Sequence, residues 1–183
     1  MIMSEQNWAK RDRLLRAGVK SAADLRNAAR KEGGQSAVDF IIGLLIGASM
    51  LEQAVPGKGN LAKSYFRERQ RAEEVLGADI FQELGATIGS HELVLTDNGD
   101  TRQQLVVALE VERSMIEVGN SVGATKFELM ELLAITIVAS VAACATIPER
   151  TKALELVAEE LPRKQEIAGD FLRARRETEI EAL

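Results

Sequence analysis

The residues able to do nucleophilic or acid–base chemistry are few and lie far apart. His91 is the only histidine and Cys144 the only cysteine among 183 residues. A nucleophilic site needs a base beside its nucleophile, and a zinc site needs several converging ligands. His91 is therefore predicted to be a surface or capping residue, and Cys144, within an apolar helix, an inert thiol. Neither indicates a catalytic or metal site.

Two glutamates lead into the most apolar stretch of the chain. Glu128 follows Thr125 by three residues, which is the spacing of a capping box at the start of a helix. Glu131 has no such structural assignment. A cofactor-free enzyme of unknown reaction, with Glu131 as its acid or base, is therefore kept as a second alternative function.

Two loops contain fragments of ligand-binding motifs. Asp97–Asp100 (DNGD) has its glycine third rather than sixth, and Ala108 stands where a calcium loop needs glutamate. Pro56–Asn60 (PGKGN) lacks the longer glycine frame of a phosphate loop and the Ser or Thr after its lysine. We therefore expect no cofactor and no metal ion.

Positive charge is concentrated in the first part of the chain. Residues 1–75 hold 13 Lys/Arg and 9 Asp/Glu, whereas residues 76–183 hold 10 and 19. Six basic residues are candidates for contact with an anion or a nucleic acid: Arg13, Arg16, Arg26, Arg30, Lys63 and Arg67. A helix, a glycine turn at Gly18 and a capped second helix give the outline of a helix-turn-helix, so a DNA- or RNA-binding regulator is the first alternative function.

Small residues mark two helices for close packing. Gly43 and Gly47 lie four residues apart and so share one face of a helix. Ala139, Ser140 and Ala143 form a second small face, which is the partner expected for the glycines, in the same chain or in another subunit. These five residues are the predicted helix-packing contacts.

Caps and glycine stops predict helices throughout the chain. The expected spans are 4–17, 21–33, 36–55, 60–76, a short helix from 79, 101–120, 125–146, 149–160 and 162–182. Asn98-Gly99 is also a hairpin signal, so a short hairpin or turn at 92–107 competes with the start of the helix at Thr101.

A local stretch resembles a known family. Residues Val122–Leu133 and the alanine-rich helix after them resemble the turn and following helix of the carboxymuconolactone decarboxylase and alkylhydroperoxidase-D group. In that group a Cys-x-x-Cys pair and a histidine precede this turn, and residues 105–118 contain neither. The resemblance therefore implies a helical oligomer without the redox chemistry.

Composition places these elements in an all-α fold. Apolar residues make up 46% and charged residues 28%, and only three prolines are present. We expect one helical domain over 1–183, a compact bundle of about seven helices around two apolar central helices at 36–55 and 125–146. Its parts are basic N-terminal helices (4–33), an apolar core (36–147) and charged C-terminal helices (149–182). The apolar runs are too short to be presumed membrane spans, and no secretory leader is evident, so a cytoplasmic location is expected.

The absence of a catalytic constellation, together with apolar and small-residue helix faces, favours a non-enzymatic helical interaction protein. It would act as an adaptor, inhibitor or regulatory subunit, and would self-associate or bind a protein partner.

Overall fold

The fold consists of α-helices wherever the chain is described. The computed structural model describes residues 5–31, 37–54, 60–75, 101–142 and 147–181, which contain six helices and no strand. The helices are α1 (Glu5–Lys31), α2 (Ala37–Ala54), α3 (Leu61–Val75), α5 (Thr101–Ser121), α6 (Lys126–Ala142) and α7 (Ile147–Glu181). The predicted all-α class is confirmed.

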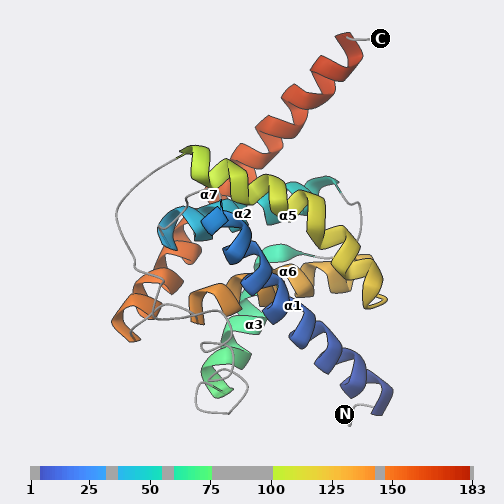
Figure 1. Cartoon of the computed structure of the whole chain (residues 1–183), viewed down its shortest axis with the longest axis vertical. Coiled ribbons are helices and arrows are strands. Elements are labelled where there is room, and N and C mark those ends of the chain that lie inside the picture. The colour runs from blue at the N-terminus through green and yellow to red at the C-terminus, as the bar shows by residue number, and fades with distance from the viewer. Residues whose placement is uncertain (1–4, 32–36, 55–59, 76–100, 143–146, 182–183) are drawn as a thin grey trace.

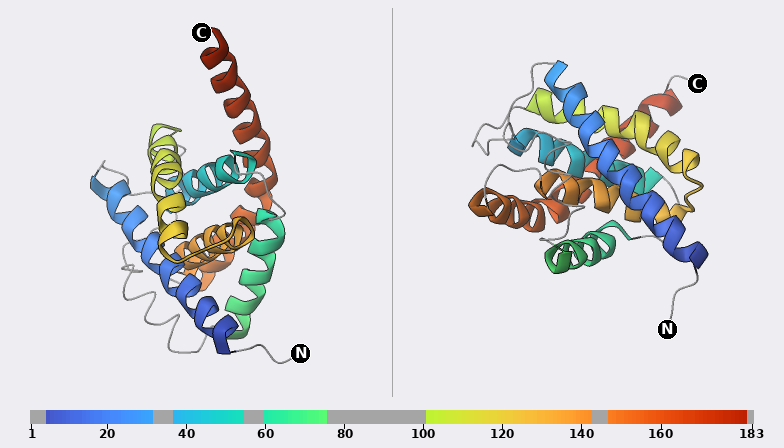
Figure 2. Two further views of the ribbon diagram at one scale, coloured as in Figure 1. Left: turned by 90° about the vertical axis from the view of Figure 1, so that its right-hand side faces the viewer. Right: turned by 60° about the horizontal axis from the view of Figure 1, so that its bottom comes forward.

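The helices form three layers with α2 and α6 in the middle. α1 and α5 lie on one side of this pair, and α3 and α7 lie on the other (Figures 1 and 2). α2 packs against α5 and α7, while α6 packs against α1 and α3. The second half of α7 projects from this body and ends at the top of Figure 1.

The two central helices carry the core, as their sequences predict. Every residue from 39 to 51 in α2 is buried, and so is every residue from 129 to 141 in α6 except the half-buried Glu131. A helix that is apolar all round is stable only when neighbours cover all of its faces. Covering both helices on all sides requires the other helices, which explains the layered arrangement.

The predicted break at Gly18 is wrong. Residues 5–31 form one helix in place of two helices at 4–17 and 21–33. A Cβ atom on Gly18 would lie 2.3 Å from Cγ2 of Ile135 in α6, so the absent side chain lets α1 and α6 approach. Gly18 is a packing residue within a helix, and residues 5–31 contain no helix-turn-helix.

The predicted break before Pro162 is also wrong, because α7 continues through this proline. An interior proline removes one backbone hydrogen bond and costs about 3 kcal/mol. Packing offsets this cost: Leu161 beside the proline and Val157 one turn earlier are both buried in the core. Side chains then join α7 to α2, where Gln53 Nε2 donates to the Gln165 carbonyl at 2.6 Å.

α5 begins at Thr101, so the second strand of the alternative hairpin at 92–107 is not formed; residues 92–100 lie outside the described residues.

α5 ends where its glycine predicts. Gly123 has φ of 69°, its amide donates to the Asn120 carbonyl, and the Ala124 amide donates to the Gly119 carbonyl at 2.9 Å. These two bonds form the Schellman motif that terminates helices at a glycine.

Other predicted features lie outside the described residues. They are the short helix from Asp79, His91, Ala143 and Cys144. Among the helices that the structure describes, none is long and apolar enough to cross a membrane.

Candidate interaction surface

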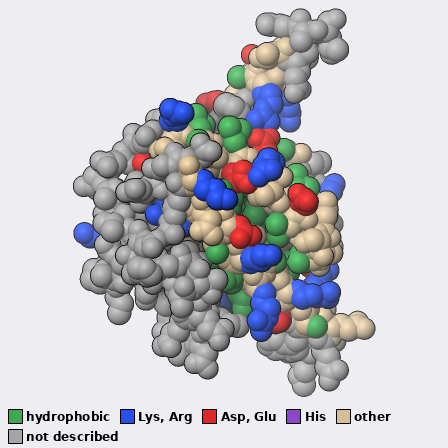
Figure 3. Space-filling view, in the orientation of Figure 1, with side chains coloured by type: hydrophobic (Ala, Val, Ile, Leu, Met, Phe, Trp, Pro, Cys, Tyr) green, Lys and Arg blue, Asp and Glu red, His purple; other side chains and the backbone are tan. Residues whose placement is uncertain are grey.

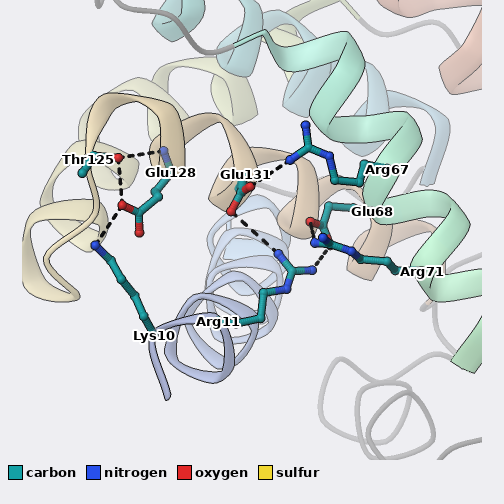
Figure 4. Close-up of polar contacts among 8 residues, drawn as sticks. All are labelled: Lys10, Arg11, Arg67, Glu68, Arg71, Thr125, Glu128 and Glu131. Carbon is teal, nitrogen blue, oxygen red and sulfur yellow. Dashed lines mark hydrogen bonds and ion pairs between the residues drawn. The ribbon is translucent and has the colours of Figure 1, made fainter. Parts of the chain in front are cut away.

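A set of ion pairs among the described residues joins α1, α3 and α6. We call it the ionic cluster: Arg11, Arg67, Glu68, Arg71 and Glu131 (Figure 4). Glu68, almost fully buried, accepts from Arg11 and from Arg71, the latter at 2.9 Å. Glu131 accepts from Arg67 Nη1 at 3.1 Å, and its second oxygen lies 3.8 Å from Arg11 Nη1.

The surroundings of Glu131 disfavour its charged form. Burial raises the pKa of Glu131 above its ordinary value, and the nearby Glu68 carboxylate raises it further, while Arg11 and Arg67 act in the opposite direction. A raised carboxyl pKa is also a property of general acids. Here, however, arginine side chains pair with the carboxylates of Glu68 and Glu131. Among the described residues, no group of three His, Cys, Asp or Glu side chains could hold a metal ion. The arrangement fits a structural link between helices.

Glu128 lies one turn before Glu131 and has the predicted capping role. Its amide donates to Thr125 Oγ1 at 3.2 Å, and Thr125 Oγ1 donates to its carboxylate at 2.8 Å. Lys10 Nζ of α1 lies 2.8 Å from the same carboxylate. Burial opposes ionisation of Glu128, but the hydrogen bonds from Lys10 and Thr125 outweigh it and lower the pKa.

The basic residues predicted to contact an anion differ in their surroundings. Arg26 is only 2% exposed, and its Cζ lies 5.6 Å from the centre of the Phe40 ring. Arg67 belongs to the ionic cluster, and Arg16 Nε donates to Asp12 at 2.9 Å. Arg13 and Lys63 are exposed on different helices, and the side chain of Arg30 is not among those described. Arg26 and Arg67 are thus held by contacts within the fold, and an anion contact through the other residues stays a prediction.

The predicted glycine face packs closely, but against a different helix. A Cβ atom on Gly43 would lie 2.6 Å from the Gln104 carbonyl oxygen, and one on Gly47 would lie 2.8 Å from that of Ala108. Both partners belong to α5, not to the α6 face expected from the sequence. Ala139 and Ser140 are buried in α6, where the Ser140 hydroxyl donates to the Thr136 carbonyl at 2.8 Å.

α5 carries a second apolar face that points away from the core. Leu105, Leu109 and Ile116 are 40%, 52% and 41% exposed, and we call them the α5 stripe. Their spacing of four and seven residues places them along one line of the helix surface. The buried residues Val107, Val111 and Met115 occupy the opposite side. The recurrence of Leu105, Leu109 and Ile116 at helical spacing is the signal in the sequence for this second face.

A groove of about 750 Å³ runs beside the α5 stripe, between α5 and the end of α1. Leu25, Ala28 and Ala29 contribute apolar groups from α1, and Val106 and Val107 do so from α5. Charged residues also line it: Asp24, Lys31, Glu110 and Arg113. Leu109 belongs to both the groove and the stripe, so the two are continuous. In Figure 3, hydrophobic side chains lie among acidic and basic ones on this face.

Comparisons with known proteins yield no match: no family model, no curated protein and no solved structure is similar to this chain. The resemblance noted at Val122–Leu133 therefore stays a local one.

Proposed function

We propose that this protein is a self-associating helical interaction protein of the cytoplasm, and that the α5 stripe forms the contact between two copies. The observation that carries the proposal is the exposure of Leu105, Leu109 and Ile116 along one line of a well-packed helix. A helix needs one apolar face to join its own core. A second, outward apolar face is typical of an interface between subunits.

The close packing of α2 against α5 makes α5 suitable as a rigid docking element. Gly43 and Gly47 bring the α2 backbone against α5, so α5 is held over much of its length by a buried neighbour. An interface built on a rigid helix loses little conformational entropy when a partner binds. The alternative of carboxylate catalysis at Glu131 receives less support, because arginines from α1 and α3 already pair with that group.

Substitution of Leu109 tests the proposal. Leu109→Glu places a charge in the middle of the α5 stripe, and burying that charge without a partner would cost far more than an apolar contact gains. Phe66→Glu is the matched control, because Phe66 in α3 is also 52% exposed but lies on another helix. Light scattering during size-exclusion chromatography should give a dimer mass for the wild type and the control, and a monomer mass for Leu109→Glu.

A wild-type protein that is monomeric throughout the micromolar range would overturn the proposal. So would a Leu109→Glu variant that keeps the wild-type mass. Circular dichroism of each variant, with unchanged helix content, establishes that the change in mass does not come from unfolding.

A further inference from the structure

One flank of the α5 stripe carries charges of alternating sign. Along the chain they are Arg102, Glu110, Arg113 and Glu117, which we call the α5 flank. A helix turns about 100° per residue, and this places all four on the same side of the stripe. Glu110 and Arg113 line the groove, so the α5 flank is the side that faces α1.

The stripe and the flank are centred within about one residue of each other. The midpoints of Leu105 and Ile116, of Arg102 and Glu117, and of Glu110 and Arg113 all fall between residues 109 and 112. When the order Arg–Glu–Arg–Glu is read backwards it becomes Glu–Arg–Glu–Arg, with the opposite sign at each position. The α5 flank is therefore complementary to its own reverse, as a two-fold symmetric interface requires.

We propose that two copies pair through antiparallel α5 helices about a two-fold axis near Glu110 and Val111. This proposal rests on the self-association proposed above. In this register Leu105 faces Ile116 of the second copy. A two-fold axis perpendicular to both helices brings the same flank of each copy together. Arg102 then lies near Glu117 of the second copy. Glu110 and Arg113 already pair within one helix, at 2.5 Å, and this ion pair lies beside the same pair of the second copy. In a parallel pair the α5 flank would meet the other side of the stripe instead.

α7 neutralises a carboxylate that lies along the stripe. Glu112 lies in line with the apolar residues, and Arg175 of α7 donates to both of its carboxylate oxygens, at 2.5 and 3.2 Å. This two-bond pairing neutralises the carboxylate within the same copy. Glu112 therefore brings no unpaired negative charge into the contact between the two α5 helices.

Charge reversal tests the register. Arg102→Glu and Glu117→Arg each place like charges together at two symmetric positions, and each should raise the dimer dissociation constant about tenfold. The double variant restores opposite charges at both positions and should return to near the wild-type value. The two residues are separated by about four turns of one helix, so they cannot rescue each other within a copy. Sedimentation velocity at low salt measures the dissociation constants.

Cysteine pairing gives an independent measurement in a Cys144→Ala background. Leu105→Cys and Ile116→Cys should form a disulfide across the two copies when the variants are mixed, because the facing Cα atoms come within bonding reach. Each variant alone should not crosslink, since equal positions lie roughly 16 Å apart along the helix.

The outcomes separate the register from self-association. Self-crosslinking of each cysteine variant, or a double charge variant as weak as the worse single one, would overturn the antiparallel register. If Leu109→Glu still abolished the dimer, the proposed function would stand. A wild-type monomer in every measurement would overturn both.

Discussion

Glu128 and Glu131 lie three residues apart on α6, yet their surroundings move the carboxyl pKa in opposite directions. Glu128 closes the first turn of the helix and pairs with Lys10, and these hydrogen bonds favour its charged form despite burial. Glu131 is buried deeper between α1 and α3, beside a second carboxylate, and its charged form is disfavoured. The same residue type thus has opposite effects on how stability depends on pH.

Glu131→Gln should reveal the raised pKa. A carboxyl whose pKa is higher in the folded state stabilises the protein fully below its ordinary value of 4.5, and this contribution is lost as pH rises through the folded value. The stability of the wild type relative to Glu131→Gln should therefore increase when the pH is lowered from 7 to 4. Urea unfolding of both proteins at each pH measures this difference, and an unchanged difference would contradict the raised pKa.

Glu128→Gln should show the reverse trend. The lowered pKa of Glu128 stabilises the fold above the ordinary value of 4.5, and this contribution disappears as pH falls through the folded value. The advantage of the wild type over Glu128→Gln should therefore shrink on acidification. Carbon-13 NMR titration of the glutamate carboxyls provides a second readout that does not depend on unfolding, and Glu128 should titrate at lower pH than Glu131.

The sequence shows which residues are charged, but not whether a charged side chain points into the fold or out to solvent. Arg26 looks like its neighbours on the basic helix, and only the packing of Phe40 beneath its guanidinium shows that it is buried. Arg67 similarly has a partner, Glu131, that lies 64 residues away. Long-range partners of this kind leave no local pattern, so the predicted anion-contact set mixed structural arginines with exposed ones.

At the scale of elements, two glycines with similar neighbours have different roles. Both Gly18 (LRAGVKSAADL) and Gly123 (NSVGATKFELM) precede a capping sequence, and both predict a helix end. Gly123 adopts positive φ, no atom lies within 4 Å of where its Cβ would stand, and the helix ends there. Gly18 stays helical because Ile135 occupies the space of its side chain. Whether the helix ends at Gly18 depends on its contact with α6, and the residues of the turn alone do not show that contact.

Gly47→Ala tests the close approach of α2 and α5. The added Cβ atom would lie within 3 Å of the Ala108 carbonyl oxygen and of Val111, so the helices must separate, and overpacking of this kind costs about 1–3 kcal/mol. Gly169→Ala is the control, because its Cβ would meet only the side chain of exposed Gln53. We expect Gly47→Ala to lower the free energy of unfolding by more than Gly169→Ala does, because the flexible Gln53 side chain can move away at the cost of at most its hydrogen bond to the Gln165 carbonyl. Chemical denaturation compares them, and a fully stable Gly47→Ala variant would disprove the close contact.

At the scale of the whole molecule, the fold class followed from the two apolar helices. Their positions, 36–55 and 125–146, agree with α2 and α6 wherever these segments are described. Which helix covers which face did not follow, because every amphipathic helix offers a similar apolar stripe. The glycine face met α5 instead of α6 for this reason. The helix number was overestimated at Gly18 and Pro162, where tertiary packing overrides a local stop.

The passage of α1 across α5 and α6 has a consequence during synthesis on the ribosome. α1 is made early, but Ile135, the partner of Gly18, follows more than a hundred residues later. At a translation rate of about 5–20 residues per second, α1 waits on the order of ten seconds for that partner. During this time α1 lacks both α5 and α6, and Leu14 and Leu25, which are buried in the finished fold, are not covered by them. The nascent chain therefore exposes an apolar helix face for longer than the formation of that helix requires.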